Sequence, residues 1–311
     1  MKKIIKPTQL PKQGTIGIIA PAGPVLPEKL DRGIRYLESL GYRVEVGASV
    51  YAEFGYLAGN DESRVNDLET MFQRPDIDAI FCARGGYGCT RILSQINYDI
   101  IAENPRILVG YSDITALQLA IFKQTGLLTF SGPMAGVEFA NDPHPQTESF
   151  LWRILSDPEP VGKLSHIKSN CSNNKHGKIT GHVLGGCLSL VAGLAGTPFL
   201  PDFDGAIFLM EDVGEKPYKI DAMLAQLKNA GVLAGIAGTL AGEFLDCEPE
   251  DGKSSLALEE VIAGYFPDVP LITNFPYGHG PLKYTLPTGG RVELDSDEGT
   301  VTFLDGCVTA K

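Results

Sequence analysis

The first half of the chain alternates short apolar segments with segments of helical spacing. Apolar runs of strand length occupy residues 15–20, 77–83 and 106–110, and amphipathic segments occupy residues 28–41 and 113–126. Strands that are apolar along their whole length, with helices between them, indicate a parallel sheet whose two faces are both covered. The alternation therefore predicts an α/β fold for this part of the chain.

The residue composition of the chain changes near its middle. Residues 157–177 are polar and rich in turn formers, which is typical of a linker. Strands and helices then alternate again, and residues 291–306 alternate by twos about a turn, as a β-hairpin does. A chain of 311 residues is also too long for one small core. We predict a flavodoxin-like parallel-sheet domain over 1–156, a linker over 157–177, and a mixed α/β domain with a terminal β-hairpin over 178–311.

Composition and charge exclude several classes of function. The formal net charge is −12, so the surface repels phosphate backbones and nucleic acid is not an expected partner. The first residues include lysines and prolines but no apolar signal segment, and no apolar run is long enough to span a bilayer. We expect a cytoplasmic protein without membrane contact, whose cysteines stay reduced and pack as small apolar side chains. The six cysteines are Cys82, Cys89, Cys171, Cys187, Cys247 and Cys307.

The segment GYSDIT, residues 110–115, places Ser112 where a buried strand turns into a helix. Parallel α/β sheets bind their ligands at such strand ends. A helix that begins at Asp113 would leave the backbone N–H of Asp113 free to meet a developing negative charge. Serine is also a favoured N-cap, which requires no catalysis, and the segment lacks the second glycine of the G-x-S-x-G elbow. The residues alone leave both interpretations open, nucleophile and helix cap.

A serine nucleophile needs a base, which is most often histidine. His279 is the best candidate, because it follows a predicted strand and is flanked by Gly278 and Gly280, which leave the imidazole accessible. It is equally compatible with a simple histidine in a glycine-rich turn. The other four lie in a loop, in the linker or in a strand: His144, His166, His176 and His182.

The base in turn needs a carboxylate that orients it. Glu211 and Asp212 end an apolar strand, where a carboxylate is unfavourable to bury without a partner. Glu243 and Asp246 stand in a similar setting. A solvated carboxylate, or one paired with a nearby lysine, explains each of them as well, so spacing alone does not separate the four.

A second glycine turn, CARGGYG at residues 82–88, follows another predicted strand. Unblocked N–H groups there could stabilise an oxyanion or hold a phosphate. Arg84 could meet a substrate carboxylate or could lie free on the surface. The turn matches neither the P-loop nor the dinucleotide-binding pattern. One further group of potential metal ligands matches no zinc spacing, so we expect no metal and no other cofactor. That group is Cys171, His176, His182 and Cys187.

Together the motifs resemble those of the LD-carboxypeptidases, serine peptidases also called muramoyltetrapeptide carboxypeptidases. The similarity covers nearly the whole chain and is carried by long, specific segments. These are IGIIAPAGPV, YLAGNDESRVNDLETMF, AIFCARGGYG, LVGYSDITAL, the stretch from GHVLGG to DAMLAQL, and NFPYGHGPLKYTLPTGGRVELD.

The resemblance implies a role for each candidate residue. It implies that Ser112 is the nucleophile, that Glu211 is the acid that orients the base, and that His279 is the base. It also implies an oxyanion hole formed by the backbone N–H groups of Asp113 and Gly86. Because these residues span both predicted domains, the site is expected in the cleft between them.

The resemblance also implies a substrate, and two alternative functions remain open. The implied reaction is hydrolysis of the L,D-amide bond before the terminal D-alanine of a murein tetrapeptide. It would occur in the cytoplasm during peptidoglycan recycling, in a homodimer, with Arg84 as a candidate contact for the substrate carboxylate. Microcin-C immunity peptidases resemble the same family and cleave peptidyl nucleotide analogues. A rival of another class is a non-catalytic protein that binds a small ligand at residues 82–88, with Ser112 only capping a helix.

Overall fold

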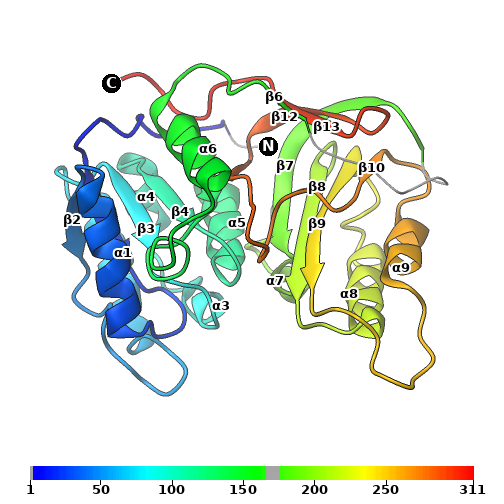
Figure 1. Cartoon of the computed structure of the whole chain (residues 1–311), viewed down its shortest axis with the longest axis horizontal. Helices are drawn as coiled ribbons and strands as arrows, with labels where there is room; N and C mark the ends of the chain where they lie inside the picture. The colour runs from blue at the N-terminus through cyan, green and yellow to red at the C-terminus, as the bar shows by residue number, and fades with distance from the viewer. Residues whose placement is uncertain (1–2, 166–174) are drawn as a thin grey trace.

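The computed structural model describes residues 3–165 and 175–311, which form two lobes lying side by side (Figure 1). Residues 3–156 build the N-terminal lobe, and most of the later residues build the C-terminal lobe. The strands of the N-terminal lobe are β1 (Thr15–Ile19), β2 (Arg43–Val46), β3 (Ala79–Cys82), β4 (Ile107–Gly110) and β5 (Thr129–Ser131). Its helices are α1 (Pro27–Ser39), α2 (Asp61–Gln73), α3 (Cys89–Ile92), α4 (Tyr98–Glu103), α5 (Ile114–Thr125) and α6 (Pro145–Ser156).

The later part of the chain carries the remaining elements. Its strands are β6 (Lys163–Ser165), β7 (Lys178–Cys187), β8 (Ile207–Val213), β9 (Gly238–Leu245), β10 (Leu271–Ile272), β11 (Leu286–Thr288), β12 (Arg291–Asp295) and β13 (Thr300–Phe303). Its helices are α7 (Leu188–Leu194), α8 (Pro217–Asn229) and α9 (Leu258–Tyr265).

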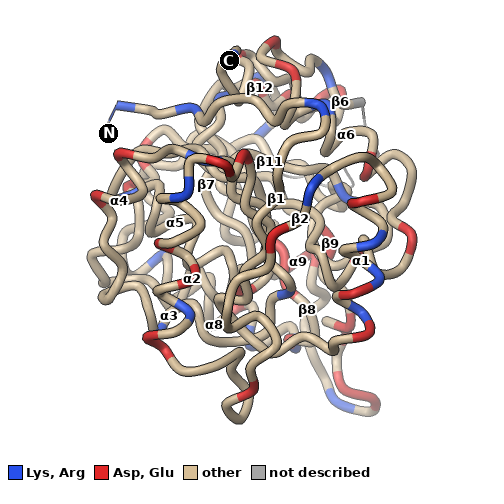
Figure 2. The backbone as a smooth tube through the Cα atoms, turned by 90° about the vertical axis from the view of Figure 1, so that its left-hand side faces the viewer, with Lys and Arg blue, Asp and Glu red and all other residues tan. Residues whose placement is uncertain are grey.

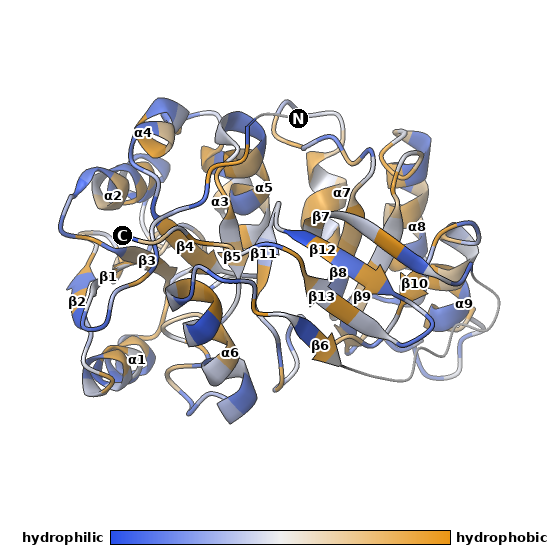
Figure 3. Cartoon of the chain, turned by 90° about the horizontal axis from the view of Figure 1, so that it is seen from above, coloured by the Kyte–Doolittle hydropathy of each residue, from blue (hydrophilic) through white to orange (hydrophobic). Residues whose placement is uncertain are grey.

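The N-terminal sheet is parallel through its first five strands. They lie in the order β2-β1-β3-β4-β5, and each neighbouring pair is parallel. This is the flavodoxin-like order of a doubly wound sheet. Helices α1 and α6 cover one face, and α2, α4 and α5 cover the other (Figure 3). The predicted α/β fold with both sheet faces covered is confirmed.

Local sequence signals explain where the N-terminal helices begin and end. Pro27 occupies the first turn of α1, where its missing N–H leaves no bond unmade, and Gly41 follows the helix with φ of 94°. Asn60 caps α2, because its side-chain oxygen accepts a hydrogen bond from the backbone N–H of Ser63. These signals fix where α1 ends and where both helices begin.

The sheet of the C-terminal lobe is mixed. Its order is β10-β9-β8-β7-β12-β13-β6, with β7 to β10 parallel and with β12, β13 and β6 antiparallel to their neighbours. Strands β12 and β13 form the predicted terminal hairpin, in which Val292 lies opposite Phe303. Strand β6, Lys163–Ser165, lies inside the segment predicted as a linker and pairs with β13.

The chain crosses between the lobes more than once. Strand β11, Leu286–Thr288, comes late in the sequence but pairs antiparallel with β5 at the edge of the N-terminal sheet. Near the other end of the chain, Thr8 forms a bridge with Thr309. The division at 156 and 178 stays a prediction, since strand pairing joins segments across it.

The structure shows how the charged residues and the cysteines are distributed. Basic and acidic residues are interspersed over the side of the chain that Figure 2 shows. Five cysteines lie within the described residues, all of them free and buried, and burial raises the pKa of the Cys307 thiol to about 12. The predictions for Cys171 and His166 lie outside the described residues. Across residues 3–165 and 175–311, none of the helices combines the length and apolarity that crossing a bilayer requires.

Candidate active site

The turn from β4 to α5 holds Ser112 in an unusual backbone conformation. Its φ is 64°, in the left-handed region, which costs a residue other than glycine about 1–3 kcal/mol. Asp113 occupies the N-cap position of α5 and the helix begins at Ile114, one residue later than the sequence suggested. Ser112 therefore stands before the N-cap, and its strain is of the kind that recurs at reactive sites.

The carboxylate of Asp113 ties this turn to the glycine turn beside it. One of its oxygens accepts a hydrogen bond of 2.8 Å from the backbone N–H of Cys89, at the start of α3. The side chain is almost fully buried, and that burial raises the pKa of Asp113 although the bonds from Cys89 and the nearby Arg64 lower it. Arg64 in turn donates a 3.0 Å bond to the carbonyl of Gly88. The Ser112 turn and the glycine turn are thus held as one unit.

Gly85 lies directly against the Ser112 side chain. A Cβ atom at residue 85 would be 2.8 Å from the Cβ of Ser112, 2.9 Å from its Oγ and 3.4 Å from the backbone nitrogen of Asp113. Gly86 follows with φ of 112°, a conformation that favours glycine, and the carbonyl of Gly85 accepts a 3.1 Å bond from Gly23. Only a glycine at 85 lets the turn approach the hydroxyl so closely.

On the other side of the site, His279 is paired with Glu211. The Nδ1 atom of His279 lies 2.8 Å from Oε2 of Glu211, at the end of β8. The Glu211 side chain is 0% exposed, and burial raises its pKa although the bond from His279 lowers it. With the carboxylate ionised, Nδ1 donates to it, which leaves Nε2 free to accept a proton. Gly278 makes this approach possible, since a Cβ there would lie 2.7 Å from Oε2 of Glu211.

The structure shows which of the candidate carboxylates contacts His279. Asp212, the residue after Glu211, accepts hydrogen bonds from the backbone N–H groups of Ser189 at 2.8 Å and Val213 at 2.9 Å. Its side chain therefore holds the start of α7. Glu243 on β9 has a buried oxygen with no partner among the described atoms. Asp246 follows β9 and is exposed. Within the described residues, Glu211 is the one of the four carboxylates that is hydrogen-bonded to His279.

The other described histidines have local structural roles. His144 caps α6 by accepting from the backbone N–H of Gln146, and Nδ1 of His182 lies 2.9 Å from the carbonyl of Gly289. His176 is exposed and lies 3.3 Å from a carboxylate oxygen of Asp297. Over the described part of the chain, no three His, Cys, Asp or Glu side chains are grouped as metal ligands.

Three contacts bring the serine side and the histidine side together at the lobe interface. The rings of Tyr111, next to Ser112, and His279 are 5.1 Å apart between centroids, at an angle of 65°. The backbone N–H of Cys187, at the end of β7, donates a 3.1 Å bond to Oγ1 of Thr115 in the first turn of α5. Tyr277 and Ser131 share a bond of 2.7 Å between their hydroxyls, and Tyr277 is two residues before His279.

Comparison with known proteins identifies the family of the chain. Residues 16–132 match the family described as "LD-carboxypeptidase N-terminal domain", and residues 180–294 match "LD-carboxypeptidase C-terminal domain". A "Probable murein peptide carboxypeptidase" of Bacillus subtilis is 38% identical over 304 residues, which cover 97% of this chain and 95% of that relative. The chain belongs to the LD-carboxypeptidase family.

The matches to two further relatives also cover almost all of the chain. A solved structure of a muramoyltetrapeptide carboxypeptidase from Oxalobacter formigenes has a TM-score of 0.84 and 32% identity, and the match covers 93% of this chain and 97% of that one. The "Microcin C7 self-immunity protein MccF" of Escherichia coli is 28% identical, over 94% of this chain and 93% of its own. The family predicted from the motifs is therefore confirmed.

Arg84 stands in the glycine turn of this LD-carboxypeptidase family member, two residues before Gly86. Its guanidinium donates a 3.1 Å bond to the carbonyl of Pro24, and the side chain remains exposed. The guanidinium of Arg84 is therefore accessible from solvent beside Gly85.

A hollow of about 510 Å³ lies beside His279. Tyr111, Glu138 and the segment 141–145 line it from the N-terminal lobe, and residues 279–281 and Lys283 line it from the other side. Lys283 is a functional candidate that the sequence reasoning missed. A lysine four residues after the candidate base, inside the otherwise uncharged run GPLKYTLP, was the available signal.

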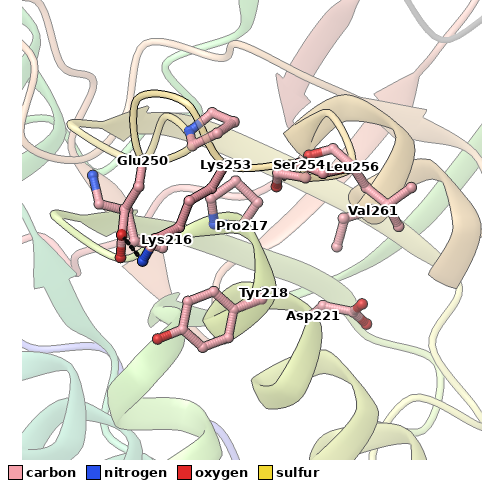
Figure 4. Close-up of a pocket in the computed structure, with 11 residues that line it drawn as sticks. Lys216, Pro217, Tyr218, Asp221, Glu250, Lys253, Ser254, Leu256 and Val261 are labelled. Carbon is pink, nitrogen blue, oxygen red and sulfur yellow. Dashed lines mark hydrogen bonds and ion pairs between the residues drawn. The ribbon is translucent and has the colours of Figure 1, made fainter.

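A second hollow, of about 320 Å³, lies on the C-terminal lobe between the start of α8 and the segment after β9 (Figure 4). Tyr218 and Asp221 line it from α8, and Leu256 lines it from the opposite side. Lys253 pairs there with Glu250. None of the three triad candidates lines this hollow, so we assign the chemistry to the interface between the lobes.

Proposed function

We propose that the protein is a serine LD-carboxypeptidase that hydrolyses the L,D-amide bond before the terminal D-alanine of murein tetrapeptides. In this proposal Ser112 is the nucleophile, His279 is the general base and Glu211 orients the imidazole. The observation that carries the proposal is the 2.8 Å contact between His279 and the fully buried Glu211. The ring of His279 also meets the ring of Tyr111, which directly precedes a serine in a strained turn at the end of a parallel strand.

The proposed reaction proceeds through an acyl-enzyme. The hydroxyl of Ser112 attacks the amide carbonyl while Nε2 of His279 takes its proton, and Glu211 stabilises the resulting imidazolium. The imidazolium then protonates the leaving nitrogen, so that D-alanine departs and the ester remains on Ser112. Water, deprotonated by His279, attacks the ester and releases the shortened peptide with the serine restored.

The oxyanion of each tetrahedral intermediate would be held by backbone donors. We assign this role to the N–H groups of Asp113 and Gly86. Two features support it: the nitrogen of Asp113 follows the nucleophile at the start of α5, and the close packing of Gly85 on the Ser112 side chain brings the glycine turn to the reacting atoms. Preorganised donors of this kind are each worth about 10²–10³-fold in kcat.

The setting of the reaction also belongs to the proposal. The relatives named for murein peptides and muramoyltetrapeptides support a cell-wall peptide as substrate. We propose that the enzyme acts as a cytoplasmic homodimer in peptidoglycan recycling, without a cofactor. Arg84 is the proposed contact for the free carboxylate of the substrate.

The decisive experiment is to incubate the pure protein with a muramoyl tetrapeptide and to measure released D-alanine. We expect release by the wild type and a loss of about a thousandfold or more in kcat for Ser112→Ala, with unchanged thermal unfolding. If Ser112 took no part in the reaction, that variant would keep its function. Absence of D-alanine release by the folded wild type would refute the proposal.

A second candidate substrate class is a peptidyl nucleotide analogue. The observation that favours it is the similarity to the microcin C7 self-immunity protein along nearly the whole chain. The two activities use the same proposed triad, so the substrate has to be tested directly. Assaying the tetrapeptide and an aminoacyl sulfamoyl nucleoside side by side, and comparing kcat/KM, distinguishes them.

A further inference from the structure

A buried lysine joins the histidine segment to the opposite lobe. Lys283 is only 4% exposed, although it is four residues after His279 in a segment that borders the hollow. Its ammonium pairs with Glu138 and donates a 3.1 Å bond to the hydroxyl oxygen of Tyr111. The same ammonium lies 4.2 Å from the centroid of the Tyr111 ring.

The two partners of the ammonium belong to the N-terminal lobe and are themselves fixed. The Tyr111 hydroxyl donates a 2.8 Å bond to Glu138, whose other carboxylate oxygen accepts a 2.9 Å bond from the backbone N–H of Met134. The backbone N–H of Lys283 donates a 2.9 Å bond to Thr147 in α6. The cluster of Lys283, Glu138 and Tyr111 therefore has one member on the histidine segment and two on the serine side.

The cluster lies beside both candidate catalytic residues. Tyr111 immediately precedes Ser112 in the chain, and its ring is also in edge contact with the His279 ring. A buried ion pair is seldom needed for stability, because apolar side chains of similar volume often stabilise a protein equally well. A buried charged cluster with members near both Ser112 and His279 in the chain therefore points to a role in the reaction rather than in packing.

We propose that Lys283, Glu138 and Tyr111 are positioning residues for the reaction: they clamp the His279 segment onto the Ser112 turn and thereby fix the distance between base and nucleophile. This role rests on the proposed function. None of the three exchanges a proton with the substrate in this scheme.

The charge of Lys283 has a second consequence, for Glu211. Burial has the largest effect on the pKa of Glu211 and raises it. The bond from His279 lowers that pKa, and the Lys283 cation lowers it by a smaller amount. The cation lowers the pKa of Glu243 in the same way. Among the described residues, Asp142, His144 and His279 also carry titratable groups that line the hollow beside Lys283. Removal of the Lys283 charge is expected to raise the pKa of Glu211 further, so that activity is lost at a higher pH on acidification.

The test compares Lys283→Met, Lys283→Arg and Tyr111→Phe with the wild type. We expect Lys283→Met to lower kcat by about 10–100-fold, since a misplacement of about 1 Å can cost 10²-fold, with a nearly unchanged KM. The acid limb of the kcat/KM profile of Lys283→Met should move to higher pH. Lys283→Arg, which keeps the charge, should restore part of the lost kcat and part of the pH shift. The matched control is Lys178→Met, which removes an exposed lysine paired with Asp295 on the hairpin side of the other lobe; it should behave as the wild type.

Double substitution distinguishes a cluster from three separate residues. If the cluster acts as one unit, Lys283→Met combined with Glu138→Gln loses no more kcat than the worse single variant, whereas independent effects multiply. Labelling of Ser112 by a fluorophosphonate should slow in the same order as kcat. If Lys283→Met does not fold, Tyr111→Phe, which removes one hydroxyl, decides the question.

The outcomes separate this inference from the proposed function. A folded Lys283→Met or Tyr111→Phe with wild-type kcat and pH profile, in an enzyme that releases D-alanine, overturns the positioning role alone. A folded wild type that releases no D-alanine overturns the proposed function, and the positioning role with it.

Discussion

The two halves of the candidate site are built in different ways. The serine side is made of backbone: a residue with φ of 64°, a glycine packed on its side chain and a carboxylate that accepts from a backbone N–H. The histidine side is made of charged side chains, in which His279 pairs with Glu211 across 68 residues and Lys283 pairs with Glu138 across 145. The serine side is therefore sensitive to added volume, and the histidine side to lost charge.

The largest expected effect comes from neutralising the buried carboxylate. Glu211→Gln keeps the volume but presents an amide to Nδ1 of His279, so the imidazolium loses its stabilising charge and the correct tautomer is no longer favoured. We expect kcat to fall by about 10³–10⁴-fold, measured as D-alanine release at saturating tetrapeptide. Glu293→Gln, on the hairpin strand β12, is the matched control and should leave kcat unchanged. Equal kcat in both variants would show that the histidine side does not depend on this charge.

The next effect tests the serine side by adding one methyl group. In Gly85→Ala the new Cβ would meet the Cβ and Oγ of Ser112 at 2.8 and 2.9 Å, so the hydroxyl or the turn has to shift. We expect kcat to fall by about 10²-fold with little change in thermal unfolding. The control is Gly193→Ala in α7, where a Cβ meets nothing within 4 Å; it should keep full activity and be more stable by up to about 1 kcal/mol.

A smaller effect is expected from the exposed arginine at the edge of the glycine turn. If Arg84 binds the carboxylate of the substrate, Arg84→Ala should raise KM for the tetrapeptide by about tenfold or more, as the loss of a charged hydrogen bond does, and should change kcat little. Arg291→Ala, an exposed arginine on β12, is the control. An unchanged KM in Arg84→Ala would remove this residue from the proposed binding site.

The smallest effect is on stability and depends on pH. Burial raises the folded-state pKa of Glu211 above its ordinary value of 4.5, so the folded protein holds this proton more tightly than the unfolded chain does. The free energy of unfolding of the wild type should therefore fall, relative to that of Glu211→Gln, as pH rises from about 4.5 through the folded-state pKa. Urea unfolding of both proteins from pH 4.5 to 8 measures the difference, and a difference of the opposite sign would contradict it.

Sequence patterns located much of the fold and missed particular elements. Most strands of both sheets and the terminal hairpin were predictable because their apolar periodicity is local, whereas β6 lay inside the predicted linker. Helix α4 and helix α6 were not predicted, although His144 and Pro145 mark the start of α6 by a cap and a proline in the first turn. Strand β11 was also missed, because three residues that join the edge of a distant sheet show no pattern of their own.

The sequence by itself determined the alternation of strands and helices, the family and the position of Ser112 at a strand end, because each depends on residues close together in the chain. Only the tertiary structure decided which carboxylate meets His279, why residue 85 has to be glycine beside Ser112, and that Lys283 reaches Glu138 in the other lobe. These contacts join segments that are far apart in sequence, and burial and distance between such segments exist only after the lobes have packed.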